Sequence, residues 1–181
     1  MHAADTTGPV YFCDAAEHII GVRPASARVH ELFAGTPGAP GIINASCRKA
    51  RFNGPRSLSL HPEQHLLYVA DTGASHDPDG PRHIRAFDVT DKGKLKKSRV
   101  FATCDAGLFD GFRLDTAGRL WSSAGDGVHC FAPNGDLLGK ILVPEVVSNV
   151  CFGGVKKNRL YICGTTSLYA VLTHVNGAQV P

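Results

Sequence analysis

The chain has 181 residues, a length typical of one domain or of two small ones. It is 43% hydrophobic and 19% charged, the composition of a globular rather than a disordered protein. The net charge of +3 is small, and the short basic runs at 92–97 and 156–159 are expected in solvated hairpin turns. The printed sequence shows neither an apolar run near the ~20 residues that cross a membrane nor the pattern of a signal peptide. We therefore expect a cytoplasmic protein that binds neither nucleic acid nor membranes.

Short apolar runs bounded by turn residues predict strands along the whole chain, in four clusters. Their expected ranges are 10–13, 18–22 and 29–33; 58–60, 66–70, 84–89 and 98–102; 112–114, 120–123, 128–131 and 137–143; 149–152, 160–163 and 167–172. No window has a sustained 3.6-residue apolar period, so we expect little helix. Residues 35–55 interrupt the pattern, as a long loop or a degraded repeat unit. The six cysteines form no Cys-x-x-Cys pair, which favours free thiols over a disulfide framework.

The strand clusters also resemble one another. The stretches that begin at Leu58, Phe112 and Val150 align, with offsets of 54 and 38 residues. A four-stranded unit that recurs every 40–50 residues or so is typical of a β-propeller. The chain supplies three to four such units, whereas closed propellers have about four to eight blades. We therefore expect an all-β fold, an incomplete propeller forming a single domain over 1–181, with a diverged blade and loop over 1–50 and regular blades over 51–181.

An incomplete ring has a further consequence. Its terminal sheets would leave apolar faces without a neighbouring blade, which predicts self-association or poor solubility. A second copy of the chain is one way to complete the ring, so a homo-oligomer is expected.

Asp110 is the first candidate for chemistry. It stands just before the strand predicted at 112–114, where an unpaired buried charge would cost several kcal/mol. Its carboxylate must therefore be solvated, hydrogen-bonded or bound to a metal. The simpler alternative is a turn aspartate that caps Gly111. Asn149 also precedes a core strand, and its amide either lines the central channel or pairs with backbone. Asp71 and Asp115, at strand ends and turns, are interpreted as structural.

From about Arg51 to Gln179 the sequence resembles the C-terminal half of the gluconolactonase, regucalcin and luciferin-regenerating-enzyme family. The resemblance is carried in order by Leu-Leu-Tyr-Val-Ala-Asp-Thr-Gly from Leu66, Asp-Gly-Phe-Arg-Leu-Asp from Asp110 and Ser-Asn-Val-Cys-Phe-Gly-Gly from Ser148. It implies a six-bladed propeller that hydrolyses sugar or other lactones with a divalent metal at its central channel.

The resemblance also implies roles for single residues. The family holds its metal with a Glu, an Asn and an Asp, and the Asp also activates water; Asp110 matches that Asp. The Asn position is occupied by Arg56, and the Glu position falls on Thr7. A family segment that lines the substrate pocket is matched by Arg51-Phe52-Asn53. Arg56 either binds an anionic group of the substrate or is a surface arginine in a diverged site.

Two functions are therefore weighed. The first is metal-dependent hydrolysis of a small, sugar-type lactone, with Asp110 and Asn149 as metal ligands, Asp110 as the base, and Arg51, Asn53 and Arg56 at the substrate. Oxygen ligands favour Ca²⁺, with Zn²⁺, Mn²⁺ or Mg²⁺ as alternatives. The second is a catalytically inactive, truncated propeller that acts as a binding or scaffold module.

Overall fold

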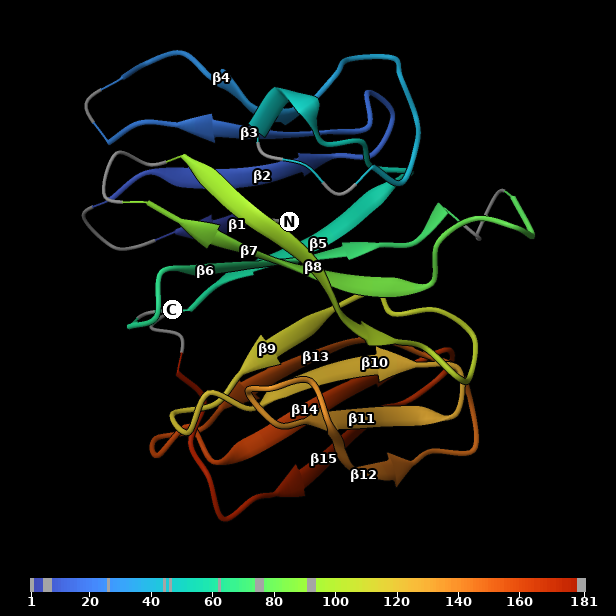
Figure 1. Cartoon of the computed structure of the whole chain (residues 1–181). Coiled ribbons are helices and arrows are strands. Elements are labelled where there is room, and N and C mark those ends of the chain that lie inside the picture. Colours follow the sequence, from blue (N-terminus) through green and yellow to red (C-terminus); the bar gives the residue numbers. More distant parts are fainter. Residues whose placement is uncertain are drawn as a thin grey trace. The chain divides into compact units, whose positions relative to one another are not determined.

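The computed structural model describes residues 2–4, 8–25, 27–43, 45, 47–61, 63–73, 77–90 and 94–178 (Figure 1). Within these ranges the protein is all-β: the strands form four antiparallel sheets, and the helical content is a single 3₁₀ turn. The chain divides into two compact units, Met1–Phe101 and Ala102–Pro181. Each unit is built from two sheets, and each is described separately below.

The first unit contains two sheets in which the strands follow chain order. The first sheet consists of β1 (His2–Ala4), β2 (Val10–Asp14), β3 (Ile19–Arg23) and β4 (Glu31–Gly35). The second consists of β5 (Pro55–Leu60), β6 (Leu66–Asp71), β7 (His83–Val89) and β8 (Leu95–Thr103). The 3₁₀ turn η1 (Cys47–Lys49) lies in the connection between the two sheets and contacts β4.

The two sheets of the first unit pack together through β1, β2 and β5. Alternating apolar residues supply the core between them, because successive strand side chains point to opposite faces. The buried core residues are Tyr11, Ile20, Phe33, Ala34, Ala50, Phe52, Leu58, Leu67, Val69, Phe87 and Leu95.

The second unit repeats this arrangement. One sheet consists of β9 (Phe112–Leu114), β10 (Leu120–Ala124), β11 (Gly127–Phe131) and β12 (Leu137–Leu142). The other consists of β13 (Val147–Gly153), β14 (Arg159–Gly164) and β15 (Leu168–Leu172). Contacts of β13 with β9, β10 and β11 join the two sheets. The buried residues of their shared core are Val128, Val147, Val150, Leu160 and Ile162.

Asp115 shows how the turns of this unit are fixed. Its Oδ1 accepts hydrogen bonds from the backbone N–H groups of Ala117 and Arg119, at 2.9 and 3.0 Å. Its Oδ2 accepts from Arg119 Nε at 2.8 Å and from Trp121 Nε1 at 2.9 Å. Gly118 adopts φ +75°, which favours glycine. This carboxylate therefore ties the β9–β10 turn to the following strand, which agrees with its interpretation as structural.

Most strand expectations are confirmed within a few residues. The structure adds β1 to the first cluster, and it keeps the last cluster at three strands in the described residues. The connection over 36–54 contains η1 but no strand among its described residues. The described part of the basic run at 92–97 continues into β8 instead of staying in a turn. All six cysteines are free. In the described ranges, no helix has the length and apolar character to span a bilayer.

Candidate functional site

Asp110 lies in the second unit, between the end of β8 and the start of β9, and is half-buried. Its backbone N–H donates a hydrogen bond to Ser123 Oγ at 3.2 Å. The next residue, Gly111, donates to the carbonyl oxygen of Ser148 at 3.0 Å, and its own carbonyl accepts from Ser123 N at 2.9 Å. These bonds fix the backbone of Asp110 and Gly111 between β10 and β13.

Asn149 lies directly against Gly111. A Cβ atom added to Gly111 would overlap the side-chain amide of Asn149, so only glycine permits this approach. The Oδ1 of Asn149 accepts a hydrogen bond from the backbone N–H of Val150 at 2.8 Å. The bond uses one of the two lone pairs of this oxygen. The structure therefore brings Asn149 next to the Asp110–Gly111 segment, and it also shows the backbone pairing that was the alternative for this amide.

The residues that the family resemblance assigns to the substrate pocket lie in the first unit. The guanidinium of Arg51 donates to the carbonyl oxygens of Arg48 and Ala50, at 3.2 and 3.0 Å, so it braces its own loop. Asn53 is half-buried, and its side chain packs on Gly73. The backbone N–H of Asn53 donates to Asp71 Oδ1 at 2.7 Å. Arg51 and Asn53 thus share one braced segment.

Arg56 is exposed and occupies a β-bulge, where the β5–β6 register shifts between Pro55 and Ser57. Ser148 occupies the matching bulge of β13, where the register shifts between Val147 and Asn149. By the alignment of the repeats, Asp110 stands at the equivalent position before β9. Three sheets therefore carry an arginine, an aspartate and a serine at the same position. Thr7, the other position implied by the resemblance, lies outside the described residues.

Sequence reasoning missed a buried ion pair behind the segment that carries Arg51 and Asn53. Arg85 Nη1 lies 3.3 Å from Asp71 Oδ2, and both side chains are fully buried. Arg85 also donates to the carbonyl oxygen of Arg51 at 2.7 Å, and its guanidinium lies 4.8 Å from the ring centroid of Phe52. A cation inside the apolar run at 83–89 was the available signal. The pair holds residues 51–53 in place from both ends.

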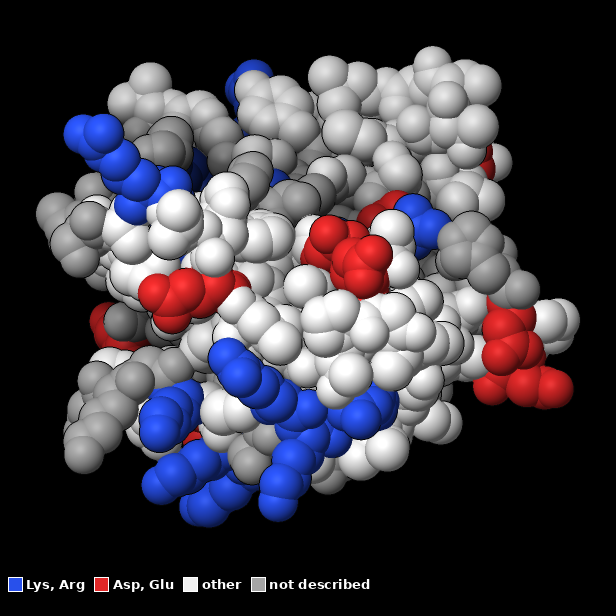
Figure 2. Space-filling model, turned by 90° about the horizontal axis from the view of Figure 1, so that it is seen from above, with Lys and Arg blue, Asp and Glu red and all other residues white. Residues whose placement is uncertain are grey.

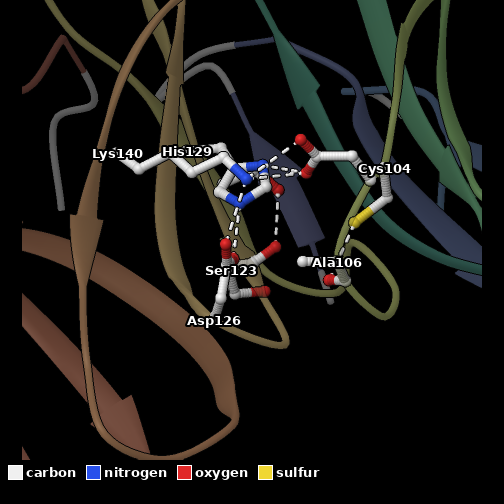
Figure 3. A network of polar contacts seen from close by, with 8 residues as sticks. Cys104, Ala106, Ser123, Asp126, His129 and Lys140 are labelled. Carbon is white, nitrogen blue, oxygen red and sulfur yellow. Dashed lines mark hydrogen bonds and ion pairs between the residues drawn. The ribbon is translucent and has the colours of Figure 1, made fainter.

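A second polar network was also missed (Figure 3). His129 is buried on β11, and its Nε2 lies 2.6 Å from Asp126 Oδ1. Lys140 Nζ, from β12, lies 2.8 Å from Asp105 Oδ1 and 3.0 Å from Asp126 Oδ2. Figure 3 shows Ser123, the partner of the Asp110 N–H group, beside Asp126 and His129. The network therefore borders the segment that carries Asp110.

The acidic members of this network are suited to remain ionised. The hydrogen bond from Lys140 lowers the pKa of Asp105. Burial opposes ionisation of Asp126, but hydrogen bonds from His129 and Lys140 outweigh it and lower its pKa. The hydrogen bonds that Lys140 donates to Asp105 and Asp126 raise the pKa of Lys140. Ligand atoms of Asp105, Asp126 and His129 lie within 4.8 Å of one another, a spacing that suits a metal ion. Because the ammonium of Lys140 already binds both carboxylates, the network supplies its own cation.

The oxygens of Asp110 and Asn149 suit a metal of a different kind. Carboxylate and amide oxygens are ligands that Ca²⁺ and Mg²⁺ prefer. The second unit therefore offers donors that fit a hard divalent cation. At the equivalent position of the first unit, Arg56 places a positive charge instead of a neutral ligand.

Comparisons with known proteins support the sequence resemblance. A family model described as the SMP-30/Gluconolactonase/LRE-like region matches residues 43–166. A gluconolactonase of Zymomonas mobilis is 32% identical over 186 residues, which cover 94% of this chain and 49% of that protein. The chain thus spans about half the length of this relative.

Two solved structures share the fold. A gluconolactonase of Xanthomonas campestris superimposes with a TM-score of 0.74 at 27% identity, over 97% of this chain and 56% of that one. The calcium-binding protein regucalcin of Agrobacterium tumefaciens superimposes with a TM-score of 0.71 at 16% identity, over 100% of this chain and 63% of that one. Blade number and the incompleteness of the ring stay predictions.

Proposed function

Because the chain belongs to the SMP-30/gluconolactonase/LRE-like family, we propose that it hydrolyses a small, sugar-type lactone with the help of a divalent metal. The observation that carries this proposal is the placement of Asp110. Its backbone is fixed by Ser123, and Asn149 is packed against the adjacent Gly111. The similarity to a gluconolactonase of Zymomonas mobilis supports the choice of lactones as the substrate class.

Lactone hydrolysis requires a nucleophilic water molecule and a polarised carbonyl group. Asp110 would accept the proton of the attacking water, and this role requires an ionised carboxylate. A divalent cation bound by Asp110 and Asn149 would polarise the carbonyl and lower the pKa of the water. Ca²⁺ is our first choice because the donors are oxygens and because the structural neighbour regucalcin is described as calcium-binding. Zn²⁺, Mn²⁺ and Mg²⁺ are the alternatives.

The resemblance to the family implies that residues 51–56 contact the substrate. Asn53 offers an amide on a braced segment, whereas the guanidinium of Arg51 is already bonded to loop carbonyls. We therefore assign direct contact with lactone hydroxyl groups to Asn53 and a bracing role to Arg51. The exposed Arg56 would bind the carboxylate of an acidic substrate or of the ring-opened product.

Asp110→Asn tests this function, with Asp136→Asn as its matched control. Asp136 is an exposed turn residue of the same unit, hydrogen-bonded to Asn134 at 2.7 Å. Hydrolysis of glucono-1,5-lactone is followed by acid release, with Ca²⁺ present or chelated. We expect Asp110→Asn to lower kcat/KM about 100-fold or more, a typical loss for a general base. The kcat/KM of Asp136→Asn should stay within about twofold of the wild-type value, as expected for a surface substitution.

Two outcomes would contradict the proposal. Equal activity of Asp110→Asn and the wild type removes Asp110 from the chemistry. If the folded wild-type chain remains inactive with Ca²⁺, Mg²⁺, Mn²⁺ and Zn²⁺, the inactive binding or scaffold module is favoured. Arg56 in place of a neutral ligand supports that alternative. Loss of activity on chelation and its return with metal would exclude that alternative.

A further inference from the structure

The first unit contains a pocket of about 770 Å³ that the proposed hydrolysis does not use. It lies beside strands β2, β3 and β4, and η1 and the residue before β8 complete its lining. Pockets that bind small molecules commonly measure ~300–1,000 Å³ and combine an apolar lining with a few polar groups. The volume therefore suits an organic ligand of moderate size.

The floor of the pocket is apolar and rigid. Tyr11 and Phe33 are 4% and 8% exposed, and their rings meet edge to face with centroids 4.8 Å apart. Val22, from the strand between them, completes the floor. These side chains also pack into the core of the unit, which fixes their positions. A ligand with a hydrocarbon or aromatic body would find this surface already formed.

The rim of the pocket is predominantly cationic. Arg48 and Lys49 on η1 and Lys94 before β8 are exposed and line the pocket, together with a single acidic residue, Glu31. No carboxylate of the described residues forms an ion pair with any of the three cations. In the view from above, the largest group of Lys and Arg side chains lies in the lower part of the picture, and smaller groups lie elsewhere on this face (Figure 2). The rim therefore offers positive charge that a bound anion can neutralise.

From this combination we propose that the pocket binds an amphipathic organic anion, an alkyl or aryl carboxylate. Its apolar body would lie over Tyr11, Val22 and Phe33, and its carboxylate would be bound by Arg48, Lys49 and Lys94. A sugar lactone or its ring-opened acid carries hydroxyl groups throughout and would gain little from such a floor. The pocket is thus a binding site separate from the proposed hydrolytic function, with its own class of ligand.

The fluorescent carboxylate 11-(dansylamino)undecanoate and its methyl ester test this assignment, because the ester keeps the apolar body and replaces the negative charge by a neutral group with one more methyl. The variant Arg48→Gln/Lys49→Gln/Lys94→Gln removes the three rim cations. The matched control, Lys96→Gln/Lys97→Gln/Arg99→Gln, removes three exposed cations of β8 that do not line the pocket. We expect the rim variant to bind the carboxylate about tenfold more weakly or worse, and the control to stay within about twofold. The ester should bind both variants and the wild type equally.

A third variant locates the probe. Val22→Trp fills the pocket and should weaken binding of both the acid and the ester. The assignment is wrong if the rim variant and the control lose affinity equally, or if Val22→Trp changes neither probe. It is also wrong if the wild type binds vesicles of phosphatidylglycerol but not the free carboxylate, a result that would assign the cations to a membrane surface. Unfolding curves confirm that each variant is folded.

Discussion

Asp71 and His83 lie opposite each other in the β6–β7 pair, and burial drives both towards their neutral forms. Burial raises the pKa of Asp71 to about 6, against the opposing effects of the Asn53 N–H group and Arg85. Burial, together with the charge of Arg85, lowers the pKa of His83 to about 4. The two groups therefore affect stability in opposite directions over the same range of pH.

The first prediction concerns this range. Folded Asp71 binds its proton more tightly than the unfolded chain does, so its contribution to stability falls as pH rises from about 4 to 6. His83 binds its proton more weakly when folded, so its contribution rises from about pH 4 to 6.5. Relative to wild type, Asp71→Asn should gain stability and His83→Asn should lose it as pH rises from 4.5 to 6, each by roughly 1–2 kcal/mol. Urea unfolding at pH 4.5–6 measures the unfolding free energy of the wild type and of each variant. If these free energies change with pH in the same way for all three proteins, the prediction is refuted.

Removal of Arg85 should strongly destabilise the fold. Arg85→Met leaves the carboxylate of Asp71 buried without its partner, which costs about 3–5 kcal/mol of unfolding free energy. Arg99→Met is the matched control, because the side chains of Arg99 and its partner Asp88 are 48% and 36% exposed and surface pairs contribute about 0–1 kcal/mol. The double variant Asp71→Asn/Arg85→Met should recover part of the loss. Denaturant unfolding checks this; equal losses for Arg85→Met and Arg99→Met would contradict it.

Replacement of Lys140 should create a metal site. Lys140→Met removes the cation bound by Asp105 and Asp126 and leaves two carboxylates and His129 with ligand atoms within 4.8 Å. Two carboxylates and an imidazole suit Zn²⁺. We expect a gain of Zn²⁺ affinity of at least about tenfold over wild type by calorimetry, and no gain for the exposed turn variant Lys156→Met. Unchanged affinity in Lys140→Met would show that the lysine does not block the cluster.

The outer face of the β13–β15 sheet should mediate self-association. Leu168 and Leu172 are 69% and 67% exposed and alternate along β15 with residues that face the core. An apolar strand at a sheet edge is a template for association. We expect the wild type to form oligomers as its concentration rises, and Leu168→Lys/Leu172→Lys to lower their fraction severalfold. Val29→Lys/Ile42→Lys, at exposed positions of the first unit, is the control. Light scattering measures the oligomer mass. A wild type that stays monomeric as its concentration rises contradicts the expectation.

The strand pattern could be predicted because local chemistry determines it. A short apolar run bounded by turn residues marked Leu120–Ala124, and Asp115 with Gly118 marked the turn before that strand. The strand His2–Ala4 was missed because it is short and has no apolar alternation; its pairing with β2 defines it. Local signals are sufficient only where the strand itself carries them.

The candidate site was predicted less completely. The position of Asp110 before a strand was readable, and so was the adjacent glycine. The partners of the polar networks were not, because pairing depends on register: Arg85 and Asp71 meet across β6 and β7, and Lys140 reaches Asp105 from 35 residues away. A polar residue inside an apolar run indicates only that a partner exists.

The bulges at Arg56 and Ser148 have a consequence for how this family can diversify. A bulged residue lies outside the alternation that assigns its neighbours to the core, so its side chain can change without moving any of them. Substitutions at these two positions can therefore change the chemistry of the surface while the packing of the sheets stays the same.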